Sequence, residues 1–199
     1  MRPAIRQRLR HAMLVVALAP TLAAAASPSF DCRQARGSVQ ALICRDDALS
    51  ALDRQLVHTY AEARRHAPEE RHPALRGEQR AWLKVREACW KADDQRACVE
   101  TSYRHRIAEL QARHRLVAAA GSARYACDDR PGDIVTATFF KTEPQTVVAH
   151  RGDETALLFV APSGSGARYV GANETLWEHQ GEARIRWGRD APEMACTRK

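Results

Sequence analysis

The segment of residues 163–169, Ser-Gly-Ser-Gly-Ala-Arg-Tyr, combines hydroxyl, glycine, cationic and aromatic residues at a spacing that suggests catalysis or recognition. Ser165 is a candidate nucleophile, but Ser163 and Ala167 occupy the two glycine positions of the Gly-x-Ser-x-Gly frame that exposes a catalytic serine. The segment also lies between predicted strands, whereas that frame requires a strand-to-helix turn. Two interpretations remain: a flexible hairpin loop, or a slim loop that enters a narrow cleft and offers hydroxyl and backbone donors to buried acceptors.

Other patterns that carry chemistry are missing from the 199 residues of the sequence. There is neither a Walker A lysine nor a Gly-x-Gly-x-x-Gly run, so phosphate binding is unsupported. The sequence has no Cys-x-x-Cys or His-x-x-x-His pair, so we expect no metal site. The adjacent carboxylates Asp128 and Asp129 would point to opposite sides of a strand. We therefore predict a binding protein without cofactor or metal, and not an enzyme.

Residues 1–26 have the pattern of a bacterial export signal. Four arginines and no acid precede an apolar stretch over residues 12–26, which closes on the small residues that signal peptidase needs. The stretch is shorter than the roughly 20 residues that span a bilayer, and Pro20 interrupts it. We expect cleavage after Ala26 and no stable membrane insertion afterwards. The residues before Cys32 do not resemble a lipidation signal, so we expect a periplasmic or secreted protein and not a lipoprotein.

The charge of the chain must be divided before it is interpreted. The whole sequence carries 31 basic and 24 acidic side chains, but residues 1–26 hold four of the basic ones and no acid. Residues 27–116 have 17 basic and 13 acidic side chains, and residues 117–199 have 10 and 11. The mature protein is therefore only about +3, which gives no support to binding of nucleic acid through bulk charge.

Six cysteines remain after cleavage of the signal, at positions 32, 44, 89, 98, 127 and 196. Export favours disulfides over free thiols, but six cysteines allow 15 sets of pairs. Their positions suggest Cys32–Cys44, Cys89–Cys98 and Cys127–Cys196. The last pair would close about 70 residues and stabilise the fold by about 4 kcal/mol in the chain-entropy model.

Residues 27–115 have helical periodicity. Apolar residues recur at three- and four-residue steps from Leu49 to Ala63 and again from Leu75 to Cys89. Helix starts are indicated by Asp46-Asp47, by Pro73 in a first-turn position and by Asp93-Asp94. With a shorter helix over residues 33–44, these signals predict a small helical domain stapled by two disulfides.

A stretch rich in Ala, Gly and Ser, residues 116–124, is predicted to be a linker, and the periodicity then changes to two. Residues 134–140 alternate, and further short apolar runs are separated by turns that contain Gly, Pro, Asn and Asp. Seven or eight strands in residues 125–199 indicate a small antiparallel barrel or sandwich. The fold class is therefore a disulfide-stapled helical domain followed by a β domain. Trp82 and Trp177 are expected to be structural.

The C-terminal half, residues 123–199, resembles the MliC/PliC family of c-type lysozyme inhibitors. The likeness rests on several motifs in order: Tyr125-Ala126-Cys127, the 163–169 segment, Trp177, Gly181-Glu182-Ala183 and Cys196. The resemblance implies an eight-stranded barrel with one disulfide. It also implies that a Ser-Gly-x-x-Tyr loop inserts into the active-site cleft of lysozyme, where its serine meets the catalytic carboxylates.

Carried over by resemblance, the lysozyme-binding residues lie in two segments. The loop contributes Ser163, Gly164, Ser165, Gly166, Arg168 and Tyr169, with Ser165 as the central residue and Arg168 equally compatible with a solvated surface role. The second segment contains Gln180 and Gly181. Family members have a lysine directly before that glycine in a Trp-x-Lys-Gly run, whereas this chain has Gln180 there and one extra residue.

The N-terminal half, over about residues 30–112, resembles the LprI N-terminal-type domain. The likeness rests on the four cysteines together with Phe30-Asp31, Leu52-Asp53, Gln79, Trp82-Leu83, Arg86, Tyr103 and Arg106-Ile107. It supports the pairs Cys32–Cys44 and Cys89–Cys98. Proteins of this kind are also associated with lysozyme inhibition, but the resemblance implies no particular site residues.

These resemblances predict a protein inhibitor of c-type lysozyme that occludes the enzyme's cleft and protects bacterial peptidoglycan. Lysozyme is itself basic, so the near-neutral barrel domain is the expected contact surface. Two other classes stay open: a non-catalytic envelope binding or scaffolding module, and a wall-active enzyme, which the missing acid/base pair disfavours.

Overall fold

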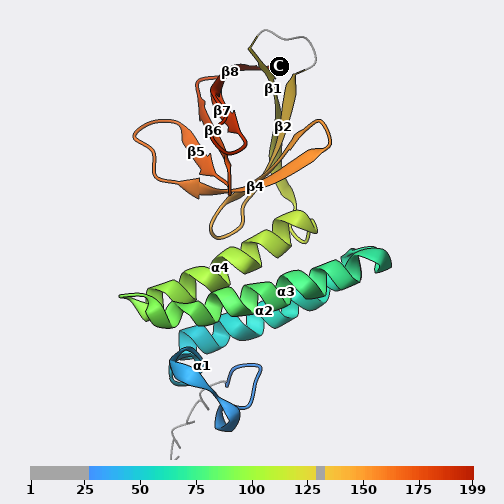
Figure 1. The fold of residues 1–199 in the computed structure, drawn as a ribbon. Helices are drawn as coiled ribbons and strands as arrows, with labels where there is room; N and C mark the ends of the chain where they lie inside the picture. The colour runs from blue at the N-terminus through green and yellow to red at the C-terminus, as the bar shows by residue number, and fades with distance from the viewer. Residues whose placement is uncertain (1–26, 129–132) are drawn as a thin grey trace, which may run out of the picture.

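The computed structural model describes residues 27–128 and 133–199, so the predicted signal peptide and Asp129 lie outside the described residues. The chain forms a layer of helices and, beyond it, a barrel of strands (Figure 1). The long helix α4 lies closest to the barrel and leads into its first strand (Figure 1). This arrangement confirms the predicted fold class.

The helical domain contains four α-helices and three short 3₁₀ turns, and the first disulfide joins its first turn to its first helix. In chain order these are η1 (Cys32–Gln34), α1 (Gly37–Arg45), α2 (Asp47–His66), η2 (Glu69–Arg71), α3 (His72–Glu87), η3 (Ala88–Lys91) and α4 (Gln95–Arg113).

The helices begin where the sequence signals indicate. Asp46 caps α2 by accepting a hydrogen bond from the Leu49 amide at 3.0 Å, and Asp94 caps α4 by accepting from the Ala97 amide at 2.9 Å. Each aspartate satisfies a backbone donor that the first helical turn would otherwise leave unpaired. Pro73 lies in the first turn of α3, where its missing N–H costs nothing.

A buried polar network links α2, α3 and α4 inside this domain. The Tyr103 hydroxyl donates to Asp53 Oδ1 at 2.8 Å and accepts from Arg86 Nη1 at 2.7 Å. All three side chains are buried, and burial raises the pKa of the Tyr103 phenol, so it remains a neutral donor. The network therefore gives the helix packing a directional component that apolar contacts lack.

Eight antiparallel strands close into a barrel in which each strand pairs with the next and β1 also pairs with β8. They are β1 (Ala119–Cys127), β2 (Ile134–Phe140), β3 (Thr146–Arg151), β4 (Glu154–Ala161), β5 (Ala167–Val170), β6 (Glu174–His179), β7 (Glu182–Trp187) and β8 (Glu193–Arg198). The inward-facing side chains form one apolar core that includes Tyr125, Val135 and Ile185.

The prediction of a linker over residues 116–124 is largely wrong, because β1 begins at Ala119 and residues 119–124 belong to the barrel. Most of these residues are small and exposed, which is typical of a loop. They adopt an extended conformation because they pair with β2 along its length, from Ala119 opposite Phe140 to Ala126 opposite Ile134. The connection from α4 to the barrel is therefore only residues 114–118.

All three predicted disulfides are confirmed. Cys127 lies directly opposite Cys196 across the β1–β8 seam, so this bond fastens the seam at which the barrel closes. Cys89–Cys98 joins η3 to α4 across the turn between the last two helices.

The two domains contact each other through α4. The His105 ring stacks on Phe159 with centroids 4.3 Å apart, and Arg104 forms an ion pair with Glu143 at 3.2 Å. A small apolar cluster around Ala112, Phe140 and Leu157 joins the end of α4 to the barrel wall. Within residues 27–128 and 133–199, no helix has the length and apolar character needed to cross a membrane.

Removal of the seam disulfide should destabilise the barrel selectively. The double substitution Cys127→Ala/Cys196→Ala opens a loop with a sequence separation of 69, which corresponds to about 4 kcal/mol in the chain-entropy model. The matched change Cys32→Ala/Cys44→Ala opens a separation of 12, worth about 3 kcal/mol, in the helical domain. Denaturant unfolding followed by hydrogen exchange resolves the two domains. Unchanged barrel protection without Cys127–Cys196 would refute the prediction.

Acidification should weaken the contact between the domains. Burial lowers the pKa of His105 below its ordinary value of 6.5, so the unfolded chain binds the proton more readily than the folded chain. The associated stability is complete above pH 6.5 and is lost as pH falls through the lower folded-state pKa. We expect the thermal midpoint to fall between pH 7 and 5, and His105→Phe to reduce that fall while keeping the stack.

The remaining fall in His105→Phe is expected from His114, whose pKa is also lowered, chiefly by burial. His58→Gln is the control, because the His58 side chain is 74% exposed. If the thermal midpoint of His105→Phe falls with pH as steeply as that of the unchanged protein, protonation of His105 is not the cause of the fall.

Candidate functional site

The loop of residues 162–166 connects β4 to β5 and is exposed along its whole length. Two side chains donate to the carbonyl oxygen of Ser165: the Ser163 hydroxyl at 2.6 Å and the Trp177 indole N–H at 2.9 Å. The hydroxyl of Ser165 itself makes no hydrogen bond within the described parts of the chain. The backbone of Ser165 is thus fixed from two sides, while its side chain remains available to a partner.

Gly166 determines how closely the loop approaches the barrel. Its φ of +65° is a conformation that other residues rarely adopt, and a Cβ atom at this position would lie 2.1 Å from the carbonyl oxygen of Glu178. Gly164 differs, because a Cβ there would meet nothing within 4 Å. Only Gly166 therefore has to be glycine to keep the loop against β6.

Tyr169 and Arg168 follow the loop but face different environments. Tyr169 is buried in the barrel core and lies edge-on to Phe139, with centroids 5.7 Å apart, and burial raises its pKa. It anchors the start of β5 from inside and offers little surface to a partner. Arg168 is exposed and lies opposite Trp177 across the β5–β6 pair. It has no ion-pair partner among the described residues, so its charge is available at the surface.

Gln180 and Gly181 form the two-residue turn between β6 and β7. Their φ values of +52° and +86° are those of the tight hairpin turn that suits the twist of antiparallel strands. The turn is tied to the end of the barrel, because the Gly181 carbonyl accepts from the Arg198 amide at 2.9 Å. Because Gly166 touches Glu178 in the same hairpin, the structure brings both predicted segments to one end of the barrel.

A groove of about 600 Å³ lies beside the loop and is lined by Ser165, Trp177, His179, Glu182 and Arg184 among others. Its walls come from the three neighbouring strands β6, β7 and β8. Trp177 was expected to be structural, and it does hold the loop, but 39% of it is exposed on the outer face of β6. The burial of its neighbour Leu176 is the alternation signal that places Trp177 outside.

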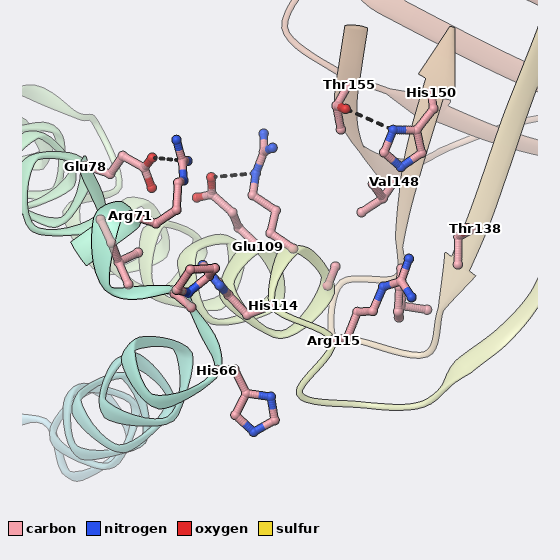
Figure 2. Close-up of a pocket in the computed structure, with 16 residues that line it drawn as sticks. His66, Arg71, Glu78, Glu109, His114, Arg115, Thr138, Val148, His150 and Thr155 are labelled. Carbon is pink, nitrogen blue, oxygen red and sulfur yellow. Dashed lines mark hydrogen bonds and ion pairs between the residues drawn. The ribbon is translucent and has the colours of Figure 1, made fainter. Parts of the chain in front are cut away.

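A larger cleft, of about 830 Å³, lies between the helical domain and the barrel (Figure 2). Its two carboxylates are already engaged, since Glu78 faces Arg71 at 3.8 Å and Glu109 accepts from Arg113 at 3.2 Å (Figure 2). Glu109 also accepts from the buried Arg106 at 2.8 Å. Both carboxylates of this cleft are therefore paired with arginines of the helical domain.

Comparison with known proteins assigns each half of the chain to a lysozyme-inhibitor family. Residues 125–194 match the family of membrane-bound lysozyme inhibitors of c-type lysozyme, MliC, and residues 32–114 match the family of lysozyme inhibitor LprI. The chain is thus a two-domain protein whose halves match two families of lysozyme inhibitors.

Relatives of similar length unite the two halves. The proteins named lipoprotein LprI of Mycobacterium bovis and Mycobacterium tuberculosis are each 34% identical over 167 residues, which is 84% of this chain and 83% of theirs. The chain therefore belongs to the LprI family. No protein of solved structure gives a significant match.

The two glycines of the loop should respond differently to the same substitution. Gly166→Ala forces a Cβ against the Glu178 carbonyl and a strained φ, so we expect the free energy of unfolding to fall by about 1–3 kcal/mol. Gly164→Ala has open space and should change it by less than about 0.5 kcal/mol. Thermal unfolding and hydrogen exchange of residues 163–179 measure both effects. Equal stability of the two variants would contradict the assigned role of Gly166.

Proposed function

We propose that this protein inhibits a c-type lysozyme by inserting the loop of residues 162–166 into the active-site cleft of the enzyme. The observation that carries the proposal is the state of Ser165: the residue is exposed and its hydroxyl bonds to no other described residue, while two hydrogen bonds hold its carbonyl oxygen. Its placement in a short, exposed loop suits a group that must reach into a narrow cleft.

The chemistry of a retaining glycosidase explains why a serine hydroxyl fits that cleft. Such an enzyme uses two closely spaced carboxyl groups, one protonated as the acid and one ionised. A hydroxyl donates one hydrogen bond and accepts others, so Ser165 can donate to the ionised group and accept from the protonated one. Both carboxyl groups would then be occupied, and the inhibitor offers no glycosidic bond to cleave.

The fixed backbone of the loop favours tight binding. A loop that becomes ordered only on binding loses conformational entropy, and that loss reduces affinity. Here the Trp177 indole and the Ser163 hydroxyl hold the Ser165 carbonyl, and Gly166 lies against the Glu178 carbonyl before any partner arrives. We infer that Trp177 acts as a positioning residue for Ser165.

Surface charge supports the barrel as the part that faces the enzyme. Residues 117–199 carry 10 basic and 11 acidic side chains, whereas residues 27–116 carry 17 and 13. A basic enzyme is repelled less by the near-neutral barrel domain than by the more positive helical domain. In the second contact segment Gln180 supplies an amide where the family has a lysine, so Gln180 and Gly181 would contact the enzyme through hydrogen bonds and not through charge.

We also propose that the mature protein begins near residue 27 and is periplasmic or secreted without a lipid anchor. The mycobacterial relatives are named lipoproteins, so the point needs an argument from this chain. All six cysteines of the sequence are used in three disulfides, Cys32 among them. A sulfur in a disulfide cannot also carry a lipid, which supports an unlipidated product.

Substitution of Ser165 tests the proposal on the full mature protein. Ser165→Ala should weaken lysozyme inhibition about tenfold or more, because a hydrogen bond to a charged group is worth about 1.5–3 kcal/mol. Ser165→Arg adds bulk and charge at the loop tip and should abolish inhibition. Ser122→Arg is the matched control, because Ser122 is exposed on β1 and does not line the groove beside the loop.

The readout is lysis of cell-wall substrate by a c-type lysozyme titrated with each variant. Full inhibition by Ser165→Arg would show that the loop does not enter the active-site cleft of the enzyme. Absence of inhibition by the unchanged protein would favour the envelope binding or scaffolding function instead.

A further inference from the structure

A second groove, of about 480 Å³, lies on the helical domain between the N-terminal segment, α2 and α3. Its volume falls within the range of roughly 300–1,000 Å³ that is typical of small-molecule sites. Many of the residues that give the helical half its family likeness line this groove, including Asp53, Gln79, Trp82 and Arg86. The lysozyme-binding loop is on the other domain and makes no use of them.

Arg86 lines the groove and has an unused donor. Its side chain is only 6% exposed, Nη1 donates to the Tyr103 hydroxyl, and Nη2 donates to Glu87. The Nε atom is buried and has no hydrogen-bond partner within residues 27–128 and 133–199. Buried donors in proteins almost always have a partner, so a lone one beside an open groove points to a ligand that supplies an acceptor.

The charges around Arg86 select a neutral acceptor. Asp53 lies 3.8 Å from the guanidinium and Glu87 is bonded to it, so two carboxylates surround one cation. An anionic ligand would be repelled by both. Asp53 itself is fully engaged by the backbone amide and hydroxyl of Ser29 and by Tyr103. The acceptor that fits the Nε–H is therefore an uncharged carbonyl, such as that of an amide.

The walls of the groove select a flat, partly apolar ligand. Trp82 and Tyr60 line it with aromatic rings, and the Trp82 indole N–H is already donated to the Ser102 carbonyl at 3.2 Å. The side chains of Gln40 and Gln79 add amide groups to the lining. A ring with an apolar face, hydroxyls at its edge and an acetamido carbonyl satisfies all of these features.

We propose that this groove binds an N-acetylated amino sugar of a glycan strand. The acetamido carbonyl accepts from Arg86 Nε–H, and the sugar ring lies against Trp82 and Tyr60. The site would hold the protein on an acetylated polysaccharide through its helical domain and leave the barrel loop free. It is independent of the inhibitory function, because no groove residue belongs to the barrel.

The test is titration of the full mature protein with tri-N-acetylchitotriose, followed by calorimetry and by saturation-transfer NMR. Cellotriose, which has the same ring linkage and no acetamido group, is the ligand control. We expect saturable binding of the acetylated trisaccharide and at least tenfold weaker binding of cellotriose. No saturation at millimolar concentration, or equal affinity for both sugars, would overturn the proposal.

Variants locate the binding on the helical domain. Leu83→Asp places a charge in the groove and should weaken chitotriose binding at least tenfold, whereas Val85→Asp, at a position on the same helix that is 67% exposed and outside the groove, should leave it unchanged. Arg86→Lys keeps the cation but removes the Nε–H and should also weaken binding about tenfold. If circular dichroism shows that Arg86→Lys is unfolded, Tyr60→Ala is tested in its place. Equal affinity in Leu83→Asp and Val85→Asp would place the sugar elsewhere and refute the site.

A polypeptide is the competing occupant, since it also offers amide carbonyls. An N-acetylated dipeptide amide is therefore titrated in parallel. Binding of that peptide at the groove without binding of chitotriose would overturn the sugar assignment.

Discussion

Closure of the barrel at the β1–β8 seam is the constraint that holds the eight strands, and with them the loop proposed to inhibit lysozyme, in one arrangement. β1 pairs with β2 along most of its length and with β8 near its end, where Cys127 is bonded to Cys196. The loop of residues 162–166 connects β4 to β5 and rests on β6, and β6 is paired with β5 on one side and with β7 on the other. A small barrel has a thin core, so a covalent bond across the seam compensates for limited apolar burial.

The second organising interaction is the buried chain of Asp53, Tyr103 and Arg86 in the helical domain. It joins α2, α3 and α4, and Ser29 attaches the N-terminal segment to the same carboxylate. A buried charge is tolerated only when it is paired and hydrogen-bonded, so these contacts fix the helices in one arrangement. Because α4 also stacks His105 on Phe159 of the barrel, this arrangement extends to the position of the second domain.

The surfaces of the two domains differ in charge and in shape. The barrel presents a slim loop whose glycine, hydroxyl and indole contacts are formed in advance, and it is almost neutral overall. The helical domain carries more positive charge and a groove lined by Arg86, whose Nε atom has no hydrogen-bond partner among the described residues. We propose the first surface for an enzyme cleft and the second for a small neutral ligand, because the chemistry of the two surfaces differs.

The sequence by itself determined the starts of α2, α3 and α4, the change of period and the residues of the loop, because each is encoded within a few neighbouring residues or in a distinctive motif. The disulfide pairs were suggested by position and by resemblance, and the structure confirmed them. The sequence did not determine β1, since Ala119 to Arg124 have loop-like composition and become a strand only by pairing with β2. The outward position of Trp177, its bond to the Ser165 carbonyl and the unpartnered Arg86 Nε were likewise decided by tertiary structure. Each depends on where a distant strand or helix places its polar atoms, and no local pattern carries that information.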